Sequence, residues 1–429
     1  MRDRSGLPPF LRARCLRGLG GLLWFVASCF QPTEAAGDGG SGPARTVRLQ
    51  CGETFAATLA EIDQQGSVTF HAHATPRVIA AEEVVGWGAF RDSDRAPQIV
   101  LDDGSWLVAA IRDLDAHQLR LDSVLWGHVV LPRESVRGIV FNPSPDPFRR
   151  DRARQQLLAE RSEDQLYLEN GDILSGQVQE FQLSDPDLAE EPDTLLFATQ
   201  GRTVPLALEN LTSVAFPSGE RGEPPEEPRM MLGLQDGSRL FVRRLETSGP
   251  LRRLVLADDL VLETDPDWLW SEITALQPLG MGVRYVSDME LSGYRHIPLL
   301  ERTRELGKDR NLRGGYLRSG GRLYLKGLAM PTASRVVCPL QGDYERFEAE
   351  LALDDLAGRQ GSVVFRVFLS DNAGGWVPAY ESPPISGGDP PVSIAIDVTG
   401  AQALVLLAEM GARGDVLDYA NWLNARLIR

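Results

Sequence analysis

The chain has 429 residues, of which 43% are hydrophobic and 24% are charged, a composition typical of a globular protein with two to four domains. Its formal net charge of −16 at pH 7 argues against nucleic acid and anionic membrane surfaces as partners, because proteins bind both with clustered Lys and Arg. Cations and neutral sugars are compatible with this charge.

Residues 1–36 have the pattern of an export leader. Basic residues between Arg2 and Arg17 precede an apolar run at 19–30, which is shorter than the roughly 20 residues that a membrane-spanning helix needs. The sequence around Cys29 resembles a bacterial lipobox, which implies lipidation of Cys29, but it also suits plain cleavage after Ser28. We therefore expect a protein that is secreted or periplasmic, or held at the cell envelope by a lipid on Cys29.

Residues 37–46 predict a flexible linker, and four stretches beyond it share one pattern. Each has an apolar strand, a tight turn at a glycine, a second strand, a further hairpin and a similar apolar ending. We call these stretches units 1 to 4, and they cover residues 47–87, 99–139, 166–214 and 232–276. The turn glycines are Gly52, Gly104, Gly171 and Gly237.

Four or five short strands per unit suit a small half-open barrel of the SH3 or Sm type, and two units sharing one sheet system would fit equally well. One short meander has little core of its own, so we expect neighbouring units to stack. Units 1 and 2 lie within 47–142, and units 3 and 4 within 165–280. Between them, residues 143–164 predict a charged, helical linker.

His71 and His73 would share one face of a strand, where they could hold a metal ion. No cysteine is nearby, so we interpret them as part of a solvated strand face. The sequence has no glycine-rich phosphate loop, serine elbow or cysteine–histidine pair, and we predict that the protein is not an enzyme. The rival hypothesis is a glycosidase or peptidase site formed in space among the units, since a catalytic carboxylate pair is recognised by its separation in space.

Residues 321–355 alternate apolar and polar side chains, which predicts antiparallel strands with one buried face. Several motifs occur here in a characteristic order: the opening segment 282–290, the segment 323–328 with its turn, the segment 344–355 and the closing segment 418–427. With these motifs, residues 281–429 resemble the NPCBM/NEW2 module, a carbohydrate-binding β-sandwich of secreted bacterial proteins. The resemblance implies a galactose-binding-like jelly-roll sandwich.

The chain departs from this family at two positions. The family usually has a His where this chain has Pro331, and an Asp before the closing Trp422 where this chain has Asn421. If the family His recognises the ligand, binding here is altered or lost; if it only packs, nothing follows. Trp422 itself is expected in the core.

Sugar binding needs an aromatic face and polar groups that converge on the sugar hydroxyls. One loop rich in Gly, Pro and Ser offers both. Trp376 and Tyr380 are expected to stack on the sugar ring, and Asp371 and Asn372 to hydrogen-bond its hydroxyls. The alternative is that Trp376 caps the sandwich core.

Asp354 and Asp355 close a predicted strand. Together with loop carbonyls they could bind Ca²⁺, because hard cations prefer oxygen ligands. The alternative is a solvated turn.

The sequence thus predicts an all-β protein, with four small SH3/Sm-like β-repeat units followed by a galactose-binding-like jelly-roll β-sandwich. We expect a non-catalytic exported protein whose C-terminal module binds a glycan. The alternative is a structural or adhesive envelope protein whose module and units contact other proteins.

Overall fold

The computed structural model describes residues 43–429 apart from 73–74, 183–192, 218–228, 249, 281–282, 299–302, 371–374 and 413. These described residues contain 36 β-strands and two short α-helices, so the all-β prediction is confirmed. No helix among them is both long and apolar enough to cross a membrane. The predicted export leader, with Cys29, lies outside the described residues, and its role stays a prediction.

The strands of the four units pair in the same way. In each unit, the first strand lies between the second strand and the last one. The elements of unit 1 are β1 (Arg45–Leu49), β2 (Thr54–Ile62), β3 (Val68–Ala72), β4 (Thr75–Ile79), the 3₁₀ helix η1 (Ala81–Glu83) and β5 (Val84–Gly88). Those of unit 2 are β6 (Gln98–Leu101), β7 (Trp106–Val108), β8 (Ala110–Leu114), β9 (Gln118–Ser123), β10 (Gly127–Pro132), η2 (Arg133–Ser135) and β11 (Val136–Val140).

Units 3 and 4 repeat this order, and unit 4 has an additional α-helix before its last strand. Unit 3 consists of β12 (Asp164–Leu168), β13 (Ile173–Gln182), β14 (Thr194–Thr199), β15 (Arg202–Ala207), η3 (Leu208–Asn210) and β16 (Leu211–Ala215). Unit 4 consists of β17 (Met230–Leu234), β18 (Arg239–Val242), β19 (Arg244–Ser248), β20 (Leu251–Val255), η4 (Ala257–Asp259), β21 (Val261–Thr264), α2 (Pro266–Glu272) and β22 (Ile273–Pro278).

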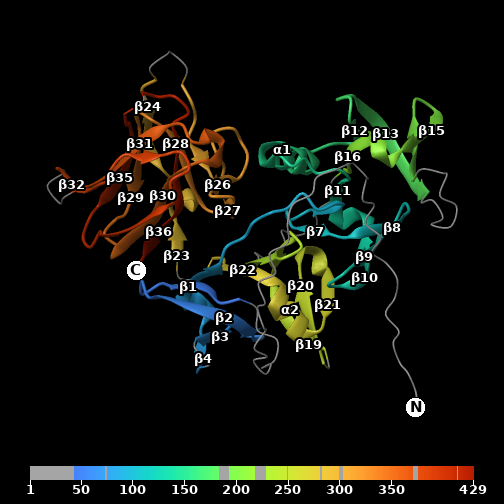
Figure 1. Ribbon diagram of the computed structural model, residues 1–429, viewed down its shortest axis with the longest axis horizontal. Helices are drawn as coiled ribbons and strands as arrows, with labels where there is room; N and C mark the ends of the chain where they lie inside the picture. The colour runs from blue at the N-terminus through green and yellow to red at the C-terminus, as the bar shows by residue number, and fades with distance from the viewer. Residues whose placement is uncertain are drawn as a thin grey trace, which may run out of the picture. The chain divides into compact units, whose positions relative to one another are not determined.

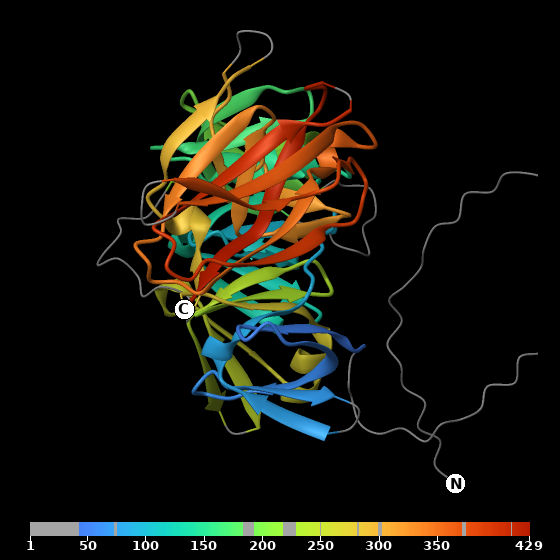
Figure 2. The same cartoon turned by 90° about the vertical axis from the view of Figure 1, so that its left-hand side faces the viewer.

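The units share one 16-stranded sheet, whose order is β15-β14-β13-β12-β16-β11-β6-β7-β18-β17-β22-β5-β1-β2-β3-β4. The units therefore follow one another as 3, 2, 4 and 1. Of the units adjacent in sequence, only units 2 and 3 pair directly through described strands, and unit 1 instead pairs with unit 4 (Figure 2). Counted outward from the β7–β18 contact, equivalent strands follow on both sides. Units 2 and 3 are thus the pseudo-twofold counterpart of units 4 and 1.

The central contact between units 2 and 4 is held by two equivalent turns. The Ser105 hydroxyl donates to the aspartate of its own turn and accepts the backbone N–H of Phe241 at 2.8 Å. Ser238 does the same in the other turn, and its hydroxyl accepts the backbone N–H of Val108 at 2.9 Å. Each hydroxyl thus satisfies a backbone donor of the opposite unit, although the strands themselves pair only briefly.

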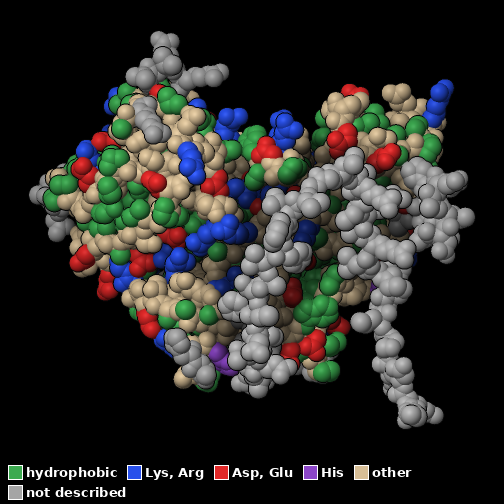
Figure 3. All heavy atoms as spheres, in the orientation of Figure 1, with side chains coloured by type: hydrophobic (Ala, Val, Ile, Leu, Met, Phe, Trp, Pro, Cys, Tyr) green, Lys and Arg blue, Asp and Glu red, His purple; other side chains and the backbone are tan. Residues whose placement is uncertain are grey.

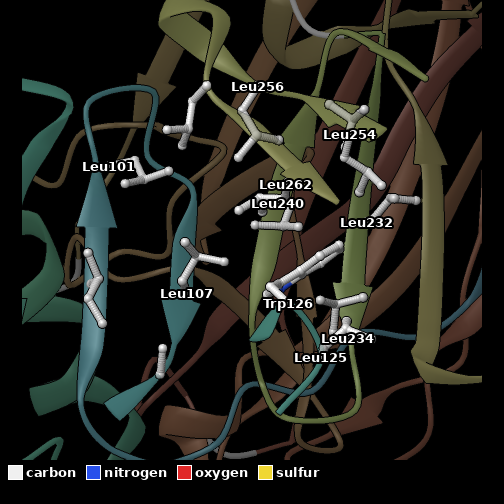
Figure 4. Close-up of a cluster of buried hydrophobic side chains, with 14 of the residues drawn as sticks. Leu101, Leu107, Leu125, Trp126, Leu232, Leu234, Leu240, Leu254, Leu256 and Leu262 are labelled. Carbon is white, nitrogen blue, oxygen red and sulfur yellow. The ribbon is translucent and has the colours of Figure 1, made fainter. Parts of the chain in front are cut away.

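The cores of units 2 and 4 are continuous. Trp126, from the turn between β9 and β10 of unit 2, lies among Leu232, Leu234 and Leu240 of unit 4 (Figure 4). The backbone carbonyl of its neighbour Leu125 accepts a hydrogen bond from the Thr264 hydroxyl at 2.8 Å. A unit with few strands gains core in this way from its partner.

The linker expected at 143–164 contains a packed helix, α1 (Pro147–Leu158). Asp146 caps its start by accepting the N–H of Phe148, with a proline at the first helical position. Contrary to a linker role, its charged residues Arg150, Asp151 and Arg154 are buried. Charged side chains therefore do not mark a solvated helix here.

The C-terminal part of the chain is a sandwich of two antiparallel sheets (Figure 1). One has the order β25-β28-β36-β30-β34, with β23 also paired to β36. The other has the order β24-β29-β35-β31-β32, with β33 also paired to β31. The strands are β23 (Val283–Tyr285), β24 (Ser292–His296), β25 (Gly307–Lys308), β28 (Gly327–Pro331), β29 (Ser334–Pro339), β30 (Arg346–Leu353), β31 (Ser362–Ser370), β32 (Trp376–Glu381), β33 (Ile385–Ser386), β34 (Val392–Asp397), β35 (Ala403–Met410) and β36 (Tyr419–Ile428).

The sandwich core is aromatic at its centre. Trp422 is fully buried, as predicted, and meets Phe365 of the opposite sheet edge-to-face, with ring centroids 5.1 Å apart. The ring centroid of Phe347, on the neighbouring strand β30, lies 6.4 Å from that of Trp422. The three rings come from β30, β31 and β36, and all of them belong to the core of the sandwich.

A hairpin of β26 (Leu317–Ser319) and β27 (Arg322–Tyr324) connects the sandwich to the units. The described residues between 43 and 429 belong to one compact part of the chain. Leu323 donates its backbone N–H to Phe90 at 2.9 Å and packs in a cluster with residues of all three of units 2, 3 and 4. Arg318 forms ion pairs with the buried carboxylates of Asp92 and Asp151.

Candidate functional site

Trp376 begins β32, an edge strand of the sandwich. It is 49% exposed, and its neighbour Val377 is 53% exposed. The alternative that Trp376 caps the core is therefore wrong. An exposed indole on a strand edge offers a flat apolar surface to a ligand.

Tyr380 does not share a platform with Trp376. Trp376 is paired with Ser370 and Tyr380 with Val367, which point to opposite faces of the sheet, because a β-bulge interrupts the register between them. Tyr380 packs on the sandwich core, and burial raises the pKa of its hydroxyl. The expectation that both rings form one stacking surface is wrong, because it assumed an unbroken period of two.

Asp371 and Asn372, expected to bind sugar hydroxyls, lie outside the described residues. Their role stays a prediction. The described part of the predicted site is thus the Trp376 end of β32.

Asp354 and Asp355, the expected calcium ligands, serve as hydrogen-bond acceptors within the fold. The buried carboxylate of Asp354 accepts the backbone N–H groups of Leu356 and Arg318 and the amide of Asn421, the last at 2.9 Å. Burial raises the pKa of Asp354 to about 6.

The two oxygens of Asp355 accept the backbone N–H groups of Gly320 and Gly321, both at 2.8 Å. Among the described residues, no three His, Cys, Asp or Glu side chains gather as a metal site. Calcium binding by Asp354 and Asp355 stays a prediction, and a cation there would have to displace these hydrogen bonds.

A second candidate site is a cavity of about 210 Å³, which we call the His296 pocket. It lies where β24, β28 and β35 end and β36 begins. Its lining residues are His296, Pro298, Arg304, Pro331, Thr332, Met410, Asp415, Leu417, Asp418 and Tyr419.

The imidazole of His296 is placed to act as a hydrogen-bond donor. Its Nδ1 accepts the backbone N–H of Arg304 at 3.0 Å, so that the neutral ring carries its proton on Nε2. Burial lowers the pKa of His296, the Arg304 charge lowers it further, and Asp415 opposes them. The ring is therefore neutral near pH 7, and it offers Nε2–H to a hydroxyl or carbonyl oxygen.

Two other polar groups of the pocket, Asp418 and Arg304, already have partners. Asp418 accepts the Ser362 N–H at 2.7 Å and the Thr332 hydroxyl at 3.2 Å. Burial raises the pKa of its carboxyl group. The Arg304 guanidinium lies 5.5 Å from the centre of the Tyr419 ring.

The two candidate sites lie at opposite ends of the same sheet. β31 pairs Val363 with Met410, which lines the His296 pocket, and pairs Ser370 with Trp376. Seven residues of strand separate Val363 from Ser370, which corresponds to about 23 Å at the usual rise of a strand. One small sugar would not contact both sites.

Comparison with known proteins identifies the C-terminal part of the chain. Residues 282–428 match the model of the NPCBM/NEW2 domain. These residues form an NPCBM/NEW2 domain. A Renibacterium salmoninarum protein, named for a suspected endo-alpha-N-acetylgalactosaminidase activity, is 26% identical over 146 residues. The match covers 34% of this chain but only 9% of that protein.

Two solved structures illustrate the similarity. The CBM51 module of Clostridium perfringens GH95, solved with methyl-galactose, is 24% identical, with a TM-score of 0.30, and the match covers 34% of this chain and 99% of that one. The tandem CBM51 modules of Sp3GH98 from Streptococcus pneumoniae are 12% identical, with a TM-score of 0.30 and coverage of 64% and 90%.

The departures of this NPCBM/NEW2 domain from its family fall at defined places. Pro331, where the family usually has His, is paired with Tyr419 in the wall of the His296 pocket. His296 enters the same pocket from β24, so an imidazole is present although it comes from another strand. Asn421 donates to Asp354, where a family Asp would set two carboxylates side by side.

Sequence reasoning missed His296, Arg304 and Asp415. None of them belongs to the motifs that carry the family resemblance. These residues come together because β24 pairs His296 with Ser334, three residues after Pro331. That pairing has no local sequence signal.

Proposed function

We propose that the protein binds a glycan through its NPCBM/NEW2 domain and catalyses no reaction. The observation that carries this proposal is the exposure of Trp376. Its ring is half exposed, whereas the other tryptophan of the domain, Trp422, is buried. Burying one face of an indole against the C–H groups of a sugar contributes roughly one to a few kcal/mol. Affinity at a single site is therefore weak.

The surface of the domain suits a neutral ligand. On the face drawn in Figure 3, hydrophobic, acidic and basic side chains are interspersed rather than gathered in one patch of a single charge. With a net charge of −16, the chain has no general attraction for acidic glycans. We therefore expect neutral sugars, among them galactosides, to bind better than sulfated or uronic ones.

The experiment is calorimetric titration of the full chain with a panel of neutral and acidic glycans, repeated with Trp376→Ala, His296→Ala and Trp268→Ala. Trp268 is the matched control, because it is a 44% exposed tryptophan on α2 of unit 4. We expect Trp376→Ala to abolish binding and Trp268→Ala to leave it unchanged. Loss of binding in His296→Ala alone would move the site to the His296 pocket and overturn the assignment to Trp376.

The relative named for a glycosidase is matched over too little of its length to extend that activity to this chain. Our proposal therefore stops at binding, and turnover of any glycan of the panel would contradict it. Export, with or without a lipid on Cys29, belongs to the proposal and rests on the leader sequence alone.

The second candidate function is that of a structural or adhesive envelope protein. Pro331 at the family His position supports it, because a domain that has lost glycan recognition there could instead bind other proteins. A glycan panel silent with and without Ca²⁺, together with a protein partner recovered by cross-linking, would select this function.

A further inference from the structure

An open groove of about 1130 Å³ lies between units 2 and 3. Unit 2 contributes His117 and the start of η2, and unit 3 contributes the first half of β13 and the end of β14. We call it the β13 groove. Ile173 is 55% exposed on its wall, next to the part-buried Leu174.

The pseudo-twofold relationship shows what the groove can hold. Unit 4 is the counterpart of unit 2, and β2 of unit 1 is the counterpart of β13. Where unit 2 has only the three residues of η2 before its last strand, unit 4 has the helix α2. This helix packs against β2 and buries Leu269 and Trp270. One half of the molecule thus covers this strand with its own helix, whereas in the other half no helix of the described residues covers β13.

The charges of the groove specify its partner further. Arg133 is the only Lys or Arg among the described residues that line it, and its charge is engaged by Asp164 at 3.0 Å and by the ring of Phe216 at 3.8 Å. Glu134 and Glu163 are exposed on the rim. The charge that remains available is negative, which favours a basic partner.

We propose that the β13 groove binds a short helical segment of a protein partner, with aromatic or aliphatic side chains flanked by Lys or Arg. The bound helix would cover β13 of unit 3 next to unit 2, as α2 of unit 4 covers β2 of unit 1. This binding function is separate from glycan binding by the NPCBM/NEW2 domain, because none of the described residues of that domain lines the groove.

The probe is a fluorescent peptide with the sequence of residues 264–273, in which Asp267→Lys, Ser271→Lys and Glu272→Lys make it basic and the capping Asp265 is kept. The control peptide has the unchanged acidic sequence. We expect the fluorescence anisotropy of the basic peptide to rise to saturation as the full chain is added. Added salt should weaken this binding. The acidic peptide should bind at least tenfold more weakly.

Three variants locate the binding. The affinity for the basic peptide should fall at least tenfold in Ile173→Arg. It should fall as much in the double variant Glu134→Lys and Glu163→Lys. Val78→Arg is the matched control, because Val78 is a 70% exposed valine on β4, and it should change nothing.

Equal binding of both peptides, or binding that survives both groove variants, would overturn the proposal. So would a neutral oligosaccharide whose binding is lost in Ile173→Arg, because the groove would then be a sugar site. Trp376→Ala should leave the peptide affinity unchanged, so that failure of the glycan proposal and failure of this one give different results.

Discussion

Arg318 donates to both carboxylate oxygens of Asp92, at 2.6 and 3.2 Å, across 226 residues of chain. Arg318 belongs to the β26–β27 hairpin of the sandwich, and Asp92 lies between units 1 and 2. Burial alone would raise the pKa of Asp92, but Arg318 and Arg154 lower it more, and the carboxyl is held below its usual range. The carboxylate therefore stays ionised in the interior, where it holds the hairpin to the units.

Removing Arg318 should destabilise the whole described part of the chain. Arg318→Met leaves Asp92 and Asp151 buried with one cation fewer, and breaking a buried ion pair on one side costs about 3–5 kcal/mol. Equilibrium denaturation measures the loss, and the exposed Arg310→Met is the control. A loss below 1 kcal/mol would show that the hairpin does not depend on this pair.

The two serines of the central turns should contribute equally. Ser105→Ala leaves the N–H of Phe241 without its acceptor, and Ser238→Ala does the same to Val108, at a cost of about 1–3 kcal/mol each. Asp172→Ala, at the equivalent turn position of unit 3, is exposed and should cost much less. Unequal losses in the two serine variants, measured by urea unfolding, would contradict the pseudo-twofold equivalence.

Trp376 and Trp422 should respond differently to truncation. Trp422→Ala empties a fully buried site and should cost about 3–5 kcal/mol, whereas Trp376→Ala removes a half-exposed ring and should leave the melting temperature nearly unchanged. Calorimetric melting of the two variants measures the difference. A large shift for Trp376→Ala would mean that its ring supports the fold.

Asp354 should make stability fall as pH rises. Its folded pKa of about 6 lies above the unfolded value of about 3.9, so the folded state binds this proton more tightly. The contribution is present in full below about pH 4 and is lost as pH rises through about 6. At neutral pH the loss amounts to about 2–3 kcal/mol.

Asp354→Asn removes this titration. The fall in unfolding free energy between pH 4 and pH 7.5 should then be smaller than in the unchanged chain by about that amount. Asn421 can turn its amide to serve the new side chain, because its Oδ1 has no hydrogen-bond partner among the described residues. Identical pH slopes for the two proteins would show that Asp354 does not titrate in this range.

The all-β fold could be predicted because the alternation of apolar and polar side chains and the glycine turns are local signals, carried by residues close together in the sequence. The order of the units in the sheet could not, although one signal was present. Only the turns of units 2 and 4 read Asp-Gly-Ser, and it is these serines that bridge the two units. A serine hydroxyl in a tight turn gives no indication of which distant N–H it will bind.

The candidate site was predicted in part for the same reason. The composition around Trp376 left open whether its ring is exposed or caps the core, and the bulge that turns Tyr380 to the core depends on the partner strand. The burial of Arg150, Asp151 and Arg154 was missed, because a run of charges normally marks a solvated helix. Their partners come from segments far away in sequence.

The sheet of the four units ends in β4 on one side and β15 on the other, and each of these strands contains a proline, Pro76 and Pro205. An unpaired strand edge is a template on which strands of other molecules can add, and molecules that associate through such edges grow into fibrils. Proline supplies no N–H for that addition. The four units are themselves joined by strand pairing, and a proline on each edge strand of their sheet opposes the addition of further molecules.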